Sequence, residues 1–154
     1  MKSSKDEFLG SLSVKFFDQV QKSFLRVDTI RAEEKGARLG RFLCTIDKKH
    51  RLRTFSNLRL AFPEWSETQI QSTGYKVYEH FGIVLGDFLR TPARSVEDLM
   101  ASIEFDDMSH FDRAVEYGRG VLICGAHFGN WERVGHYAAT KFPISTVARD
   151  ANQG

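Results

Sequence analysis

Residues 121–126 read Val-Leu-Ile-Cys-Gly-Ala, and residues 127–132 continue as His-Phe-Gly-Asn-Trp-Glu. The first stretch is a short, wholly apolar run, which is typical of a strand covered on both faces in a parallel sheet. Helical spacing follows over residues 130–141, and residues 144–147 then have the pattern of a second strand. A strand, a helix and a strand in this order form a βαβ unit, so this stretch predicts an α/β fold.

The chain upstream of residue 100 has mainly helical patterns. Apolar residues at helical spacing predict an amphipathic helix over residues 8–27, which either packs on the core or lies on a membrane surface. A second helix is predicted over residues 31–47, where Gly36 and Gly40 weaken it.

A basic helix is predicted over residues 48–61, ending near Pro63. Ser66 followed by Gln69 is a capping-box pattern, which opens a helix through about Arg90. Farther along, short elements are predicted at three places: a helical turn after Ser95, a strand at residues 103–105 and a helix capped by Ser109.

The predicted sheet is incomplete, because the chain ends at Gly154, directly after the second predicted strand, and a parallel sheet needs more strands. We therefore expect an α/β fold with a mainly helical region over residues 1–100. Residues 101–154 are then the start of an α/β core, and the chain as a whole is one incomplete domain.

The composition and net charge of the chain limit the kinds of molecule that it is expected to bind. The chain has 154 residues, 42% of them hydrophobic, and a net charge of +2. This composition is globular, and so small a net charge argues against nucleic acid as the partner. Residues 31–59 are locally basic, which suits phosphates on lipid headgroups, on an acidic carrier or on nucleic acid, or simply a solvated helix face. No apolar window approaches the roughly 20 residues that span a bilayer, so membrane contact is expected to be peripheral.

His127 and Glu132 are the clearest candidates for catalytic residues. They lie five positions apart, so on one continuous helix their side chains would point about 140° away from each other. They can meet if His127 sits in a turn before the helix and Glu132 in its first turn, with Gly129 allowing the sharp backbone path. The carboxylate would then orient the imidazole, which can act as a general base on a hydroxyl.

Two alternatives accompany this interpretation of the site. In the general-base interpretation, backbone N–H groups around Gly129 and Asn130 can stabilise the oxyanion. The first alternative is that His127 is simply a histidine hydrogen-bonded in a turn. Glu132 and His136 share a helix face, so with His127 they could also ligate a metal ion, although no further ligand is obvious nearby.

Two segments together resemble one protein family. Residues 118–132, with a His followed five positions later by an acid, resemble the core motif of the bacterial lipid A biosynthesis (lauroyl/myristoyl) acyltransferases. Residues 57–64 resemble the upstream Asn-Leu and Phe-Pro segment of the same family. The likeness runs from about residue 48 to the end, and it makes the chain similar to the amino-terminal half of such an acyltransferase domain.

The resemblance implies the transfer of a fatty acyl chain, usually from acyl carrier protein, to a hydroxyl of a lipid A precursor or a related glycolipid. It implies His127 as the general base, Glu132 as its orienting partner and Arg149 as a residue that binds an anionic group of a substrate. No metal or organic cofactor is expected. The location implied is the cytoplasmic face of the bacterial inner membrane, where this chain would be peripheral.

Members of this family are roughly twice as long as this chain, and many begin with a membrane-spanning helix. A second hypothesis follows from the position of Gly154: a truncated, non-catalytic remnant that binds membrane or carrier without turnover.

Overall fold

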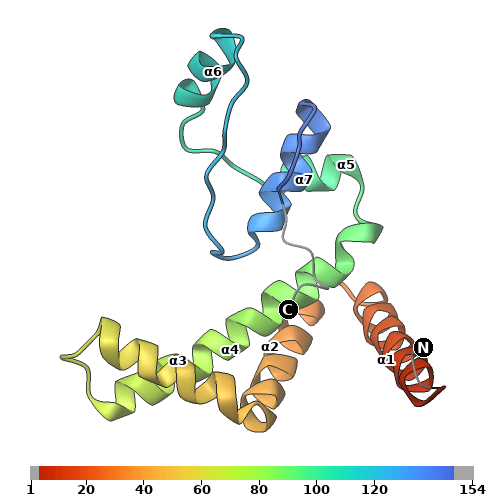
Figure 1. The fold of residues 1–154 in the computed structure, drawn as a ribbon, viewed down its shortest axis with the longest axis vertical. Coiled ribbons are helices and arrows are strands. Elements are labelled where there is room, and N and C mark those ends of the chain that lie inside the picture. Colours follow the sequence, from red (N-terminus) through yellow and green to blue (C-terminus); the bar gives the residue numbers. More distant parts are fainter. Residues whose placement is uncertain (1–3, 148–154) are drawn as a thin grey trace. The chain divides into compact units, whose positions relative to one another are not determined.

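The computed structural model describes residues 4–147, and every regular element within that range is a helix (Figure 1). The helices are α1 (Ser4–Leu25), α2 (Thr29–Ile46), α3 (Lys48–Ala61), α4 (Glu67–Arg90), the 3-10 turn η1 (Thr91–Ala93), α5 (Val96–Ala101), α6 (Ser109–Glu116) and α7 (Trp131–Lys141). Backbone contacts divide the chain into two compact units, Met1–Ala93 and Arg94–Gly154. That the whole chain is one incomplete domain stays a prediction.

Helices α2 and α4 form the largest interface of the first unit. Their facing stripes contain small residues four positions apart, so the two backbones nearly touch. A Cβ atom placed on Gly40 would lie 2.0 Å from the Tyr78 carbonyl oxygen, and one on Gly82 would lie 2.1 Å from the Gly36 carbonyl oxygen. Glycine at these positions is therefore what lets the helices approach so closely.

The carboxyl-terminal end of α1 closes one end of this helix pair. Phe24 is 1% exposed and forms the core with Ala32 and Leu89. The Gln21 amide donates a hydrogen bond to the Leu89 carbonyl oxygen at 3.2 Å. Of the two interpretations offered for residues 8–27, the core-packed helix therefore holds for this end of α1. Farther back, its side chains at positions 14, 16 and 17 are exposed.

The helix starts follow local capping chemistry closely. Ser66 and Gln69 form the predicted capping box at the start of α4, and Ser95 caps α5. Asp28 and Asp47 cap α2 and α3 in the same way. The prediction for Ser109 is wrong, because its N–H and hydroxyl both bond to the carboxylate of Asp107, and the N-cap of α6 is Met108. An Asp two residues upstream competes successfully for the serine.

The predicted α/β core is wrong, because none of the three predicted strands forms in the described range. Residues 121–126 and 144–147 are irregular and do not pair with one another, and residues 103–105 are irregular as well. Leu122 is 93% exposed where a covered strand was expected. A strand is stable only when a neighbour accepts and donates its backbone hydrogen bonds. An apolar run shows what a segment would bury in a sheet, but it does not supply the neighbouring strand.

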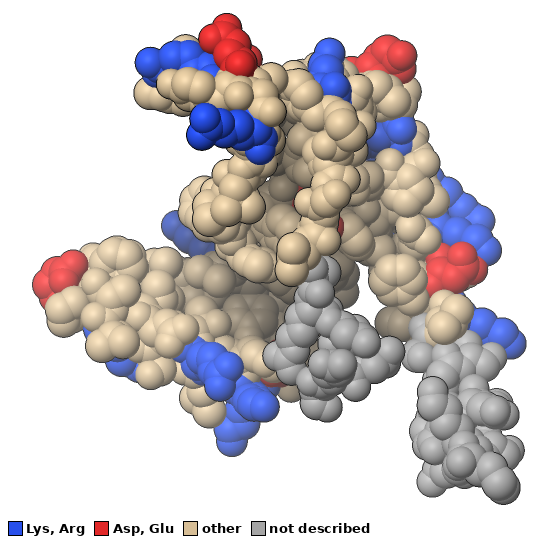
Figure 2. Space-filling model, turned by 45° about the horizontal axis from the view of Figure 1, so that its top comes forward, with Lys and Arg blue, Asp and Glu red and all other residues tan. Residues whose placement is uncertain are grey.

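The second unit has a small apolar core. Leu99 on α5 is its one buried hydrophobic residue in the described range. Two tilted ring pairs tie its segments together, Phe105 with Tyr137 at 5.0 Å and Phe111 with Phe142 at 5.1 Å between centroids. The face drawn in Figure 2 accordingly shows broad uncharged surface between scattered Lys, Arg, Asp and Glu side chains.

No helix in the described range combines the length and the apolar character needed to cross a bilayer.

Candidate active site

His127 lies in the irregular segment just before α7. The Phe128 N–H donates to the Ala126 carbonyl oxygen at 2.8 Å, so His127 is the central residue of a three-residue turn. Asn130 is the N-cap of α7, and Glu132 is the acidic residue of its first turn. The backbone arrangement proposed from the sequence, with His127 before the helix and Glu132 inside it, is therefore confirmed, although no strand leads into it.

Gly129 joins the turn to the helix with a φ of 56°, in the left-handed region. A Cβ atom there would meet nothing within 4 Å, so the backbone conformation, and not a lack of space, is what requires glycine. The predicted sharp path at this residue is confirmed.

The side chains of the pair do not meet. The His127 ring packs edge-on against Trp131, with 4.7 Å between centroids and 60° between planes. Within residues 4–147, no hydrogen bond or ion pair joins His127 to Glu132. His127 is exposed and Glu132 is half-buried, so the ring has room to change rotamer. Catalytic hydrogen bonds are often unmade before substrate binds, so the roles of the two residues stay predictions.

The alternative metal site does not form in the described part of the chain. No three His, Cys, Asp or Glu side chains in that part are grouped so that they could hold a metal ion. His136 is exposed on α7, one turn beyond Glu132. The three residues considered for this alternative therefore do not make a ligand set. Arg149 lies outside the described residues.

A family model described as bacterial lipid A biosynthesis acyltransferase matches residues 29–153, which is most of the chain. The chain belongs to this family. The match takes in α2 through α7, the His127–Glu132 block and the Asn57-to-Glu64 segment. Comparisons with curated proteins and with solved structures gave no match. Membership assigns the protein to the acyltransferases of lipid A biosynthesis.

A hollow near the motif was not anticipated from the sequence. It has a volume of about 520 Å³, is open to solvent and is lined by Ala114, Tyr117, Arg119, Gly120, Val121 and Leu122. Its lining is mainly apolar, with Arg119 as its cation, but Tyr117 is 79% and Leu122 93% exposed, so the hollow is a shallow surface feature and not a pocket that would enclose a ligand. The sequence offers only the Gly118-Arg119-Gly120 run, which predicts a turn; the structure shows that both glycines have positive φ.

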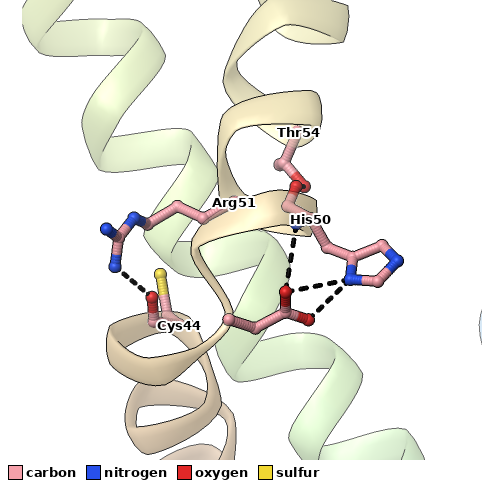
Figure 3. Close-up of polar contacts among 5 residues, drawn as sticks. Cys44, His50, Arg51 and Thr54 are labelled. Atoms are coloured by element: carbon pink, nitrogen blue, oxygen red, sulfur yellow. Dashed lines mark hydrogen bonds and ion pairs between the residues drawn. The ribbon is translucent and has the colours of Figure 1, made fainter.

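A histidine held by a carboxylate does occur in this acyltransferase, but at the α2–α3 corner (Figure 3). The His50 Nδ1 atom lies 2.7 Å and 2.9 Å from the two carboxylate oxygens of Asp47. The same carboxylate accepts the His50 N–H at 3.1 Å, and this backbone bond is the main reason that the pKa of Asp47 is lowered. Arg51 donates to the Cys44 and Thr45 carbonyl oxygens at the end of α2.

These contacts identify the corner as a capping structure. The N–H and carbonyl groups at helix ends lack hydrogen-bond partners within the helix. Here Asp47 accepts a hydrogen bond at the start of α3, and Arg51 donates to carbonyl groups at the end of α2. Cys44 is buried beneath them, and burial raises the pKa of its thiol. The Asp47–His50 contact belongs to this capping structure, so we assign the pair no chemistry.

Proposed function

We propose that this acyltransferase moves a fatty acyl chain from an acyl carrier protein thioester to a hydroxyl of a lipid A precursor or related glycolipid. His127 is the general base and Glu132 its orienting partner. The observation that supports this is the position of His127 at the apex of a tight turn just before α7, with Glu132 in the first turn of that helix. The acceptor hydroxyl is the nucleophile, so the site needs no serine or cysteine.

The proposed reaction has two steps. His127 takes the proton of the acceptor hydroxyl while its oxygen attacks the thioester carbonyl carbon, which gives a tetrahedral oxyanion. The oxyanion collapses, the carbon–sulfur bond breaks, and the imidazolium returns its proton to the leaving thiolate. Backbone N–H groups around Gly129 and Asn130 are the proposed oxyanion donors, at the positive end of the α7 dipole.

Glu132 acts in this scheme after a rotation of the His127 ring away from Trp131. A carboxylate on one ring nitrogen fixes the tautomer and stabilises the imidazolium that forms. Arg149 is proposed to bind an anionic group of a substrate. Acceptor glycolipids are presented at a membrane, so we propose a peripheral location on the cytoplasmic face of the inner membrane.

The test is an acyl-transfer assay with acyl carrier protein as donor and a lipid A precursor in detergent micelles as acceptor. General-base help is worth roughly 10²–10⁴-fold in rate, so His127→Ala should lose about that much. Glu132→Gln should lose less and should shift the pH profile of the rate. His136→Ala is the matched control, since His136 is an exposed histidine on the same helix and should keep the wild-type rate.

Two results would count against the proposal. If His127→Ala transferred acyl chains as fast as wild type, His127 would have no part in the reaction. If the folded wild-type chain bound acyl carrier protein or vesicles but showed no turnover, the non-catalytic remnant would be the better description.

A further inference from the structure

Helix α3 has an unusual balance of charge. It carries five basic residues and no acidic one, namely Lys48, Lys49, Arg51, Arg53 and Arg59. Two of the five are engaged within the protein. Arg51 binds the end of α2, and Arg59 makes a two-point ion pair with Glu67 at 2.7 Å and 3.0 Å.

The other three basic residues have no such partner. Lys48, Lys49 and Arg53 are exposed, and within residues 4–147 none of them makes an ion pair or a side-chain hydrogen bond. The nearest acid in sequence, Asp47, is engaged with His50. The charge of Lys49 helps to lower the pKa of Asp47, but the two make no ion pair. Three cations without an ion pair at the amino-terminal half of one helix, where the helix dipole is also positive, form a concentrated site for anions.

Exposed leucines share this outward side of the helix. Leu52 is 55% exposed and Leu60 is 84% exposed. At about 100° per residue, Lys49, Arg53 and Leu60 fall within roughly 40° of one another around the helix. The opposite side packs on α4, where the Phe55 ring contacts Gly74 and lies edge-on to Tyr75. The leucines are therefore not part of the protein core.

The carboxyl-terminal end of α3 leads into a rigid aromatic turn. Phe62 and Trp65 stack at 4.1 Å with 9° between their planes. The Arg59–Glu67 pair spans this turn, and the Ser66 capping box fixes its exit. Tryptophan and phenylalanine beside exposed leucine are the side chains that favour the boundary between lipid headgroups and acyl chains.

We propose that one face of α3, centred on Lys49, Arg53 and Leu60 and flanked by Leu52 and by Lys48 in the first turn, docks on an anionic phospholipid surface. This docking face rests on the proposed function, since it places the enzyme where a glycolipid acceptor is found. Lys and Arg ammonium and guanidinium groups reach the phosphates, while the leucines enter the headgroup boundary. An acidic protein is the competing occupant, and the Phe62–Trp65 stack at the end of the same helix favours a lipid boundary over it.

The main experiment measures binding of the intact chain to vesicles by flotation. One set of vesicles contains phosphatidylcholine alone, and the other contains phosphatidylcholine with phosphatidylglycerol. The test variant replaces the three unpaired cations by glutamine: K48Q, K49Q and R53Q. The matched control removes the same charge from cations that already pair with Asp18, Asp28 and Glu34: K22Q, R31Q and R38Q.

The wild-type chain should bind the anionic vesicles and not the neutral ones, and added salt should release it. Each basic side chain near such a surface contributes about fivefold, so the test variant should bind on the order of 100-fold more weakly. The control variant should lose far less. Circular dichroism melts of both variants check that the helices remain folded.

A second variant tests the apolar half of the face independently of charge. Leu60→Ser should weaken binding to anionic vesicles by about tenfold, because a leucine that enters the lipid boundary loses its transfer free energy. Ile30→Ser is the matched control, since Ile30 is an exposed aliphatic residue on α2. It should bind as wild type does.

Three outcomes would overturn the docking face. In the first, the test variant binds anionic vesicles as well as wild type. In the second, both triple variants lose binding equally. In the third, the intact chain binds purified acyl carrier protein through α3 but binds no vesicles. Acyl transfer in detergent micelles separates this proposal from the enzymatic one. The α3 variants should keep that activity, whereas His127→Ala should lose it but still bind vesicles.

Discussion

Replacing Gly40 or Gly82 by alanine should destabilise the first unit, although the same substitution usually stabilises a helix. In an exposed helix interior, Gly→Ala stabilises by about 1 kcal/mol, because alanine loses less conformational freedom on folding. At Gly40 the new Cβ would lie 2.0 Å from the Tyr78 carbonyl oxygen and 2.7 Å from the Tyr78 carbonyl carbon. At Gly82 it would lie 2.1 Å from the Gly36 carbonyl oxygen.

The magnitude follows from what has to move. Carbon and oxygen atoms in contact lie about 3.3–3.6 Å apart, so α2 and α4 must separate by about 1 Å or more. The obstacle is backbone, which cannot rotate out of the way as a side chain can. Overpacking of this kind costs about 1–3 kcal/mol, and occasionally more. Because the gain in helix propensity offsets part of this, we expect a net loss of about 1–2 kcal/mol.

Two other glycines provide graded controls for this prediction. At Gly74 the three atoms nearest to the new Cβ all belong to the Phe55 ring, the closest at 2.1 Å, and that ring can turn, so Gly74→Ala should cost less. At Gly135 on α7 nothing lies within 4 Å, so Gly135→Ala should stabilise by up to about 1 kcal/mol.

Thermal melts followed by circular dichroism are the assay. For a chain of this size, 1 kcal/mol shifts the melting temperature by about 2–4 °C. If Gly40→Ala and Gly82→Ala raised the melting temperature as Gly135→Ala should, the close approach of α2 and α4 would not exist.

Two further predictions concern the candidate active site and the α2–α3 corner. Gly129→Ala places a side chain at a φ of 56°, which costs about 1–2 kcal/mol. The change should displace His127 and so lower the acyl-transfer rate. The melting temperature of helices α2–α4, measured by circular dichroism, should be unchanged. Asp47 has a lowered pKa in the folded chain, so its contribution to stability is present above its unfolded pKa of about 3.9 and is lost as the pH falls through the folded value. Asp47→Ala should therefore destabilise the chain at pH 7, and its difference from wild type should shrink as the pH falls through the folded pKa of Asp47, as measured by urea unfolding over a series of pH values.

The helices could be predicted where the signal is local. The Ser66 and Gln69 side chains bond to backbone groups within one turn, so the start of α4 depends on nothing distant. Pro63 and the basic run before it delimit α3 in the same way, and both helices begin where the pattern indicated. The predicted strands at residues 121–126 and 144–147 failed because a strand depends on another segment for its hydrogen bonds, and no periodicity within six residues reports that segment.

Gly36 and Gly40 show a different limit of the sequence. From helix propensity they weaken α2, and that cost is real. Their benefit appears only when α4 places Gly82 and the Tyr78 backbone against them. Residues four positions apart lie on one helix face, so Gly36 and Gly40 could have been read as a close-approach stripe, but the partner helix could not have been named.

The same contrast between local and distant contacts explains why the Asp47–His50 pair forms in this structure and the His127–Glu132 pair does not. Asp47 and His50 are three positions apart at a helix start, where side chains are neighbours, and they pair without outside help. His127 and Glu132 lie five positions apart, on either side of the N-cap residue of α7. This backbone path does not fix the imidazole, and the His127 ring packs on Trp131 instead. The turn at Gly129 is thus encoded locally, whereas the orientation of the imidazole requires a contact from outside the segment. A substrate hydroxyl beside His127 would provide such a contact, and an E132Q variant whose pH–rate profile matched wild type would show that Glu132 takes no part in it.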